Sequence, residues 1–79
     1  MPDLSHKPRI SVKEAATLRH AAMEDTACTI VDVSGDGFRL AVPRGVRCGT
    51  GYTLSFASEE HDVAIRWASL GEAGGQFLD

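Results

Sequence analysis

The chain has 79 residues, of which 43% are hydrophobic and 24% charged, and its formal net charge is −3. This length fits one small domain, and the composition is that of a folded globular protein, which excludes global disorder. The net acidity argues against a general nucleic-acid binder, because such proteins usually carry a basic surplus. We therefore expect no nucleic-acid polymer among the partners.

The charges are unevenly placed along the chain. Residues 1–10 form a predicted basic arm that contains Lys7 and Arg9, ahead of a predicted domain over residues 11–79. A local basic arm on an acidic domain suits one small anionic ligand better than a polyanion. No apolar run approaches the length of a membrane span and no signal-peptide pattern is present, so we expect a cytoplasmic protein without a membrane partner.

The first element, residues 11–23, fits two structures. Ser11 and Glu14 match a helix capping box, and the segment is rich in alanine, which favours a helix. Alternation around Ala16 and Leu18 also permits a strand that would complete a barrel. The local pattern leaves helix and strand open.

From Ala27 onward the sequence predicts short strands. "ACTIVDV", "FRLAV", "YTLSFA", "DVAIRWASL" and "GQFLD" are separated by the breaks "SGDG", "PRGVRCGTG", "SEEH" and "GEAGG". Strands with turn signals about every ten residues indicate an all-β antiparallel barrel or sandwich. Alternation predicts an interior formed by Phe38, Leu40, Val42, Leu54, Phe56, Val63, Ile65 and Trp67.

The cysteines and histidines do not form a recognisable metal or catalytic constellation. Cys28 lies in an apolar run and is predicted to be a small buried residue, whereas Cys48 lies in a loop and is predicted to be free. The three histidines are scattered, which indicates solvated side chains. No nucleophile–base pair or paired carboxylates are legible, so we expect neither a metal site nor an enzyme.

The stretch "DVSGDG", residues 32–37, is the most informative. It resembles the start of an EF-hand calcium loop, but the twelfth position, which should be glutamate, is Pro43, and the flanks predict strands rather than helices. A hairpin turn is predicted, with Gly37 free to take a positive φ. Asp32 and Ser34, two residues apart, are predicted to share one face as a polar edge for a nucleobase.

The motif D-x-S-x-x-G, present as Asp32, Ser34 and Gly37, resembles the signature of the PilZ domain, a bacterial receptor module for cyclic di-GMP. In that family an R-x-x-x-R motif precedes it, and Arg9, 23 residues upstream of Asp32, stands at the second arginine. "GTGYTLSF" and "AIRWASLGEAGGQFL" resemble later family segments. The resemblance covers residues 5–79 and implies a small split β-barrel, a strand within 11–23, and cyclic di-GMP bound by Arg9, Asp32, Ser34 and Gly37.

Two departures from the family pattern affect the expected function. Ser5 stands where the first arginine is expected, and Lys7 is expected to compensate partly as a point charge. We also expect no C-terminal helix of the kind that many PilZ domains have, so that a second copy, a partner or residues 11–23 would cover apolar surface.

Two functions follow from the resemblance. The first is a cyclic di-GMP sensor without another cofactor, which acts by ligand-dependent contact with an effector protein and possible homodimerisation. The alternative is a degenerate PilZ module that binds no nucleotide and acts by protein contact alone. The residue that bears on the choice between these two functions is Ser5. Loss of one charge-assisted contact at this position would cost about 1.5–3 kcal/mol of binding free energy.

Overall fold

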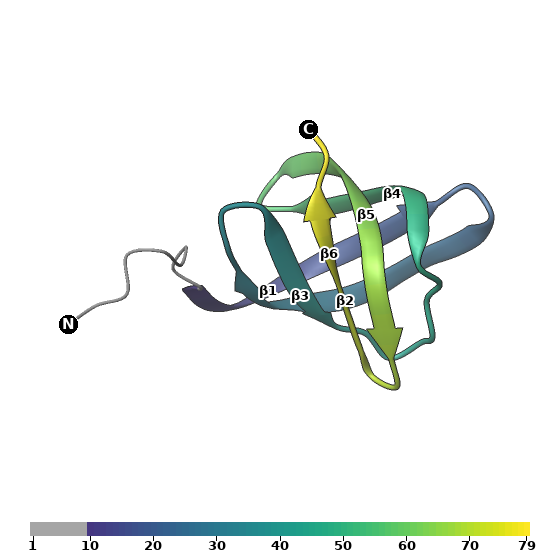
Figure 1. Cartoon of the computed structure of the whole chain (residues 1–79), viewed down its shortest axis with the longest axis horizontal. Helices are drawn as coiled ribbons and strands as arrows, with labels where there is room; N and C mark the ends of the chain where they lie inside the picture. Colours follow the sequence, from purple (N-terminus) through teal and green to yellow (C-terminus); the bar gives the residue numbers. More distant parts are fainter. Residues whose placement is uncertain (1–9) are drawn as a thin grey trace.

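The computed structural model describes residues 10–79, which form six β-strands and no helix (Figure 1). All strand pairs are antiparallel, and the predicted all-β class is confirmed. No helix in this range could cross a membrane. The strands are β1 (Ile10–His20), β2 (Met23–Val33), β3 (Gly37–Ala41), β4 (Gly49–Phe56), β5 (Glu59–Ser69) and β6 (Glu72–Phe77).

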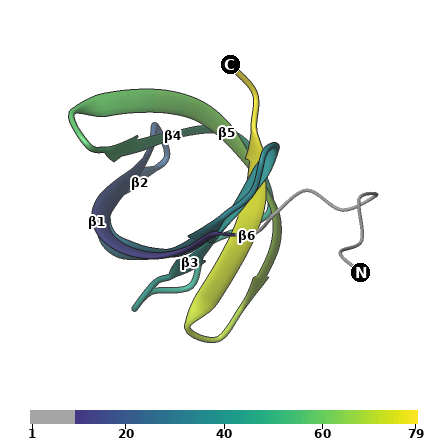
Figure 2. The ribbon, with the colours of Figure 1, turned by 90° about the vertical axis from the view of Figure 1, so that its left-hand side faces the viewer.

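The six strands close into a barrel, as the curled sheet in Figure 2 shows. Their spatial order is β1-β2-β3-β6-β5-β4, and β4 pairs back with β1. Closure gives each strand a paired neighbour on both sides over at least part of its length, which limits exposed strand edges. The pairing of β3 with β6 brings the end of β6 beside the β2–β3 turn, although the two are far apart in sequence.

Residues 11–23 adopt the strand alternative, because they lie in β1, the following turn and the start of β2. Leu18 is fully buried and pairs with Thr26 on one side and Leu54 on the other. Two paired neighbours satisfy the backbone along this part of β1. This tertiary pairing outweighs the modest intrinsic preference of alanine for a helix.

The barrel interior contains most of the predicted core. Phe56 is only half-buried but packs against it. Alternating side chains of β1 and β2 complete the interior with residues that the prediction did not include. The buried apolar side chains are Ala16, Leu18, Cys28, Ile30, Phe38, Leu40, Val42, Tyr52, Leu54, Val63, Ala64, Ile65 and Ala73.

The predicted burial of Trp67 is wrong, since this residue is 42% exposed. The pairing of β5 with β6 shifts register between Ile65, which faces Gly75, and Trp67, which faces Gly74. Arg66 is therefore an extra residue in β5, a β-bulge. Because side chains alternate with a period of two, one inserted residue moves Trp67 to the outer face.

The two cysteines are free thiols in different environments. Cys28 is buried in the core, as predicted, and its burial raises the pKa of the thiol from 9.0 to about 11. Cys48 is exposed in the chain between β3 and β4, also as predicted. A buried neutral thiol acts as a small apolar side chain, so Cys28 has a packing role.

Candidate ligand-binding site

The stretch that carries the D-x-S-x-x-G motif closes the β2–β3 hairpin. The amide of Ser34 donates to the carbonyl of Gly37 at 2.8 Å. The hydroxyl of Ser34 lies 3.4 Å from Oδ1 of Asp36 and 3.5 Å from the Gly37 carbonyl oxygen. From β6, the amide of Phe77 donates to the carbonyl of Asp36 at 3.2 Å. The turn is thus held both internally and by the last strand.

Glycine is needed at position 37 for a different reason from the one predicted. The expected positive φ is not found at Gly37; in the described chain the glycines with positive φ are Gly49, Gly51 and Gly71. A Cβ atom at Gly37 would instead lie 2.7 Å from the carbonyl oxygen of Gly75. The close approach of β3 to β6 therefore requires glycine here.

Asp32 lies at the end of β2 with its side chain only 5% exposed, and Oδ2 is 2.8 Å from Nη2 of Arg39. The pairing of β2 with β3 shifts register between Ile30 and Asp32, so Asp32 is paired with Arg39 in β3. Arg39 also lies 3.9 Å from Glu72 through Nη1. The Asp32 carboxylate thereby fixes the direction of the Arg39 guanidinium group.

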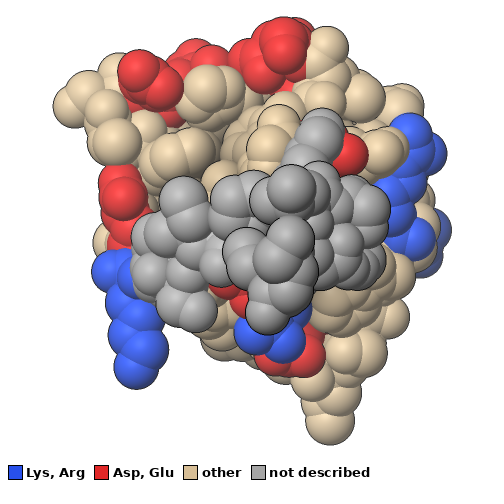
Figure 3. Space-filling view, turned by 60° about the vertical axis from the view of Figure 1, so that its left-hand side comes forward, with Lys and Arg blue, Asp and Glu red and all other residues tan. Residues whose placement is uncertain are grey.

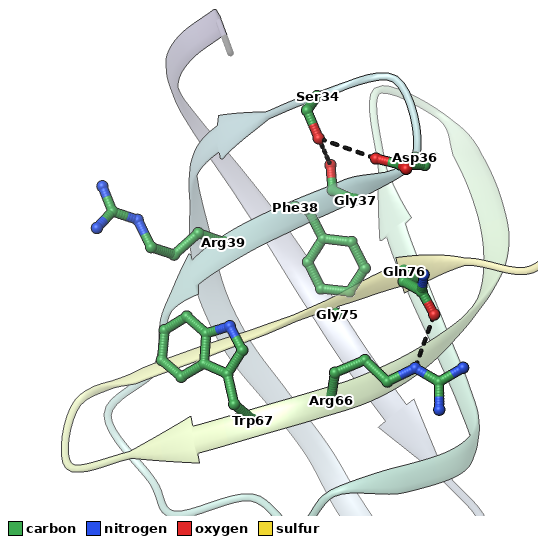
Figure 4. Close-up of a pocket in the computed structure, with 9 residues that line it drawn as sticks. All are labelled: Ser34, Asp36, Gly37, Phe38, Arg39, Arg66, Trp67, Gly75 and Gln76. Carbon is green, nitrogen blue, oxygen red and sulfur yellow. Dashed lines mark hydrogen bonds between the residues drawn. The ribbon is translucent and has the colours of Figure 1, made fainter. Parts of the chain in front are cut away.

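An open pocket of about 360 Å³, which we call the turn pocket, lies beside this hairpin (Figure 4). The β2–β3 turn and β3 form one side, and β5 and β6 form the other. Two guanidinium groups, one hydroxyl, one carboxylate and two aromatic rings surround it. The lining residues are Ser34, Asp36, Gly37, Phe38, Arg39, Arg66, Trp67, Gly75 and Gln76.

The two arginines of the turn pocket are both held by neighbours and both remain accessible. Nε of Arg66 donates to Oε1 of Gln76 at 2.7 Å, and Figure 4 shows its terminal nitrogens beyond this contact. The Arg39 side chain is 41% exposed, although its Nε atom is buried and has no hydrogen-bond partner among the described residues. Guanidinium groups held in this way suit phosphate oxygens or the acceptor edge of guanine.

Charge on the molecular surface is mixed in sign. Figure 3 shows both basic and acidic side chains on one face, and the chain as a whole is acidic. The turn pocket is lined by two arginines and one carboxylate, Asp36, and the guanidinium group of Arg39 is paired with Asp32. This distribution suits a small ligand with few phosphates better than a long polyanion.

A second pocket, of about 530 Å³, lies at the opposite end of β2. Its polar groups are partly occupied by internal contacts: the hydroxyl of Tyr52 donates to the carbonyl of Arg47 at 2.8 Å, and Nδ1 of His20 accepts from the amide of Ala22 at 3.0 Å. None of the predicted ligand residues lines it. The turn pocket is the better candidate site.

The structure brings part of the predicted site together. Ser34 and Gly37 line the turn pocket, whereas Asp32 does not line it and touches Arg39, which does. The predicted ligand residues Arg9 and Lys7 lie outside the described residues, as does Ser5.

Sequence reasoning predicted only Ser34 and Gly37 among the nine residues that line the turn pocket, and it missed the two arginines and the tryptophan, Arg39, Arg66 and Trp67. Alternation in "FRLAV" and "DVAIRWASL" placed both arginines outside the barrel, but it could not show that β3 and β5 flank the same strand. Trp67 was assigned to the interior because the bulge at Arg66 leaves no local signal. The missing information was the non-local pairing.

No protein-family model and no curated protein matches this chain. Among residues 10–79, no group of three or more histidine, cysteine or acidic side chains could hold a metal ion. The fold and the turn pocket are therefore the features of the described chain that bear on its function.

Proposed function

We propose that this domain is a cytoplasmic cyclic di-GMP receptor of the PilZ type, and not an enzyme, and that the ligand binds in the turn pocket. The observation that carries the proposal is the arrangement of Arg39 and Arg66 around the turn that contains Ser34 and Gly37. The closed antiparallel barrel, with the D-x-S-x-x-G motif at a hairpin, supports the same proposal.

The chemistry of the pocket matches the parts of a cyclic dinucleotide. Arg66 and Arg39 supply charge-assisted donors for phosphate oxygens or for guanine O6 and N7. The Ser34 hydroxyl adds a polar group for the ligand, and Gly37 allows β3 to lie close to β6 beside it. In this proposal Asp32 acts by orienting Arg39, and Arg9 and Lys7 add cations from the N-terminal arm.

The second candidate is a degenerate PilZ module that binds only protein. It is favoured by Asp32, whose carboxylate is buried and already paired with a guanidinium group, so that it offers little to a guanine edge. The serine at position 5 removes one expected cation as well. Both candidates act through contact with an effector protein, and they differ in whether nucleotide controls that contact.

Calorimetric titration with cyclic di-GMP distinguishes the two candidates. Under the receptor proposal the wild type binds, Arg9→Ala abolishes binding and Asp32→Ala weakens it. Arg66→Gln should weaken binding about tenfold or more, because a charged hydrogen bond contributes at least about 1.4 kcal/mol. Arg47→Gln, which lines the second pocket, is the matched control and should bind normally.

The serine at position 5 supplies a gain-of-function test. Ser5→Arg restores the R-x-x-x-R spacing with Arg9 and should raise the affinity about tenfold or more, an effect that shrinks at high salt. Flat titrations of both the wild type and Ser5→Arg, with an intact barrel by NMR, would reject the receptor and support the degenerate module.

A further inference from the structure

The bulge in β5 places two consecutive side chains at the mouth of the turn pocket. In a regular strand Arg66 and Trp67 would point to opposite faces. Here the register shift between Ile65 and Trp67 leaves both residues exposed, and both line the pocket. A cationic group and a large aromatic ring therefore lie side by side on the outer surface.

The indole of Trp67 occupies space that only glycine leaves open. A Cβ atom on Gly74 would lie 2.5 Å from Cε2 and 2.7 Å from Cζ2 of the indole, and closer still to Nε1. The ring is thus supported from below by the β6 backbone, and Figure 4 shows it nearly face-on, in front of that strand. Its exposed fraction of 42% leaves the outer side of the ring accessible.

Strand pairing places Arg39 in the same row. Arg39 in β3 faces Gly74 in β6, and Gly74 in turn faces Trp67 in β5. Two strand spacings separate the backbones of Arg39 and Trp67 by about 9–10 Å. The glycine between them presents no side chain, so the Trp67 indole lies over it on the side where Arg39 also lines the pocket.

We propose that Trp67 is the stacking platform for one guanine base of the ligand, with Arg39 and Arg66 flanking it to contact the base edge or the adjacent phosphate. Aromatic side chains bind bases through their ring faces, and guanidinium groups supply the polar contacts that stacking lacks. This inference rests on the receptor function proposed above.

Trp67 is the only tryptophan in the chain, so its fluorescence reports on this site alone. Titration with cyclic di-GMP should change the tryptophan emission with the same midpoint as the calorimetric binding curve. Trp67→Ala should lower the affinity about 5- to 150-fold, the fold-change that corresponds to loss of one base–aromatic stack. Trp67→Phe should retain most of the affinity, and thermal melting should show both variants folded.

A second variant tests the platform without removing the indole. Gly74→Ala forces the ring from its position and should weaken binding comparably to Trp67→Ala, whereas Gly45→Ala, where nothing lies within 4 Å of the new methyl group, should bind normally. The stacking inference would be overturned, while the receptor function stands, if the wild type binds in calorimetry with unchanged tryptophan fluorescence and Trp67→Ala binds with full affinity. No calorimetric binding by either the wild type or Ser5→Arg would overturn both.

Discussion

Gly74 and Gly75 are adjacent in β6, yet alanine at the two positions should have different consequences. At Gly75 the new methyl group would lie 2.9 Å from the carbonyl carbon of Ala64, nearer still to its oxygen, and 3.0 Å from Cζ of Phe38. The Ala64 atoms belong to the β5 backbone, which is paired with β6. At Gly74 the obstructing atoms belong to the exposed indole of Trp67, which can rotate away.

The magnitudes follow from what must move. Overpacking a well-packed site costs about 1–3 kcal/mol, occasionally more, and a clash with paired backbone places Gly75→Ala at about 3 kcal/mol or above. The free energy of unfolding of a domain this size is about 4–12 kcal/mol. Gly75→Ala should therefore lower Tm by about 12 °C or more. Gly74→Ala should stay within about 1 kcal/mol, because the lower chain entropy of unfolded alanine offsets the displacement of the indole.

Urea denaturation followed by far-ultraviolet circular dichroism measures both stabilities without relying on Trp67. The emission maximum of Trp67 should shift to the red in folded Gly74→Ala, as the indole moves into solvent. Gly45→Ala, which has open space around the new methyl group, is the control for the substitution itself. Equal destabilisation by Gly74→Ala and Gly75→Ala, or a neutral Gly75→Ala, would refute this account of the β5–β6 packing.

Three further predictions test the core and the site. Arg39→Gln should lower the free energy of unfolding by about 1.5–3 kcal/mol, because it removes a charged partner of buried Asp32. Adding Asp32→Asn should recover part of the lost stability. Strict additivity of the two substitutions in this double-mutant cycle would contradict the ion pair. Leu40→Ala should cost about 2–5 kcal/mol in urea denaturation and Leu70→Ala less than about 0.5, because the first side chain is fully buried and the second fully exposed. Between pH 9 and pH 11 the unfolded chain loses the Cys28 proton while the folded chain, in which the pKa of this thiol is raised, retains it. The free energy of unfolding should therefore fall by up to about 2–3 kcal/mol over this range. Cys28→Ala should lessen the fall in pH-dependent denaturation, and identical pH profiles of the variant and the wild type would refute this prediction.

The strands that were predicted well are those in which local pattern and tertiary structure agree. In β3 and β4 the alternation of Phe38, Leu40 and Leu54 with polar or small residues matches the buried face of the barrel. Residues 11–23 could not be assigned locally, because alanine-rich composition favours a helix while the neighbouring strands favour β1. Long-range pairing decided that case, and no local pattern contains it.

The candidate site was predicted less completely than the fold. The motif correctly indicated a turn at Ser34 and Gly37, since turn chemistry is local. It could not show that Arg39 and Arg66 meet across β6, because that neighbourhood arises from barrel closure. Trp67 was misplaced for a related reason: a bulge changes the face of a residue without changing the composition around it.

Two unfavourable features of the described structure occur together at the turn pocket. Leaving the Trp67 indole 42% exposed forfeits part of the roughly 1.5–3 kcal/mol that burial of a large apolar side chain contributes. The buried Nε of Arg39 without a partner costs about 1–3 kcal/mol more. In the proposed complex a stacked base would cover the exposed indole. Departures from ideal packing concentrate at functional sites, and their coincidence beside the bulge in β5 supports the binding proposed at this pocket.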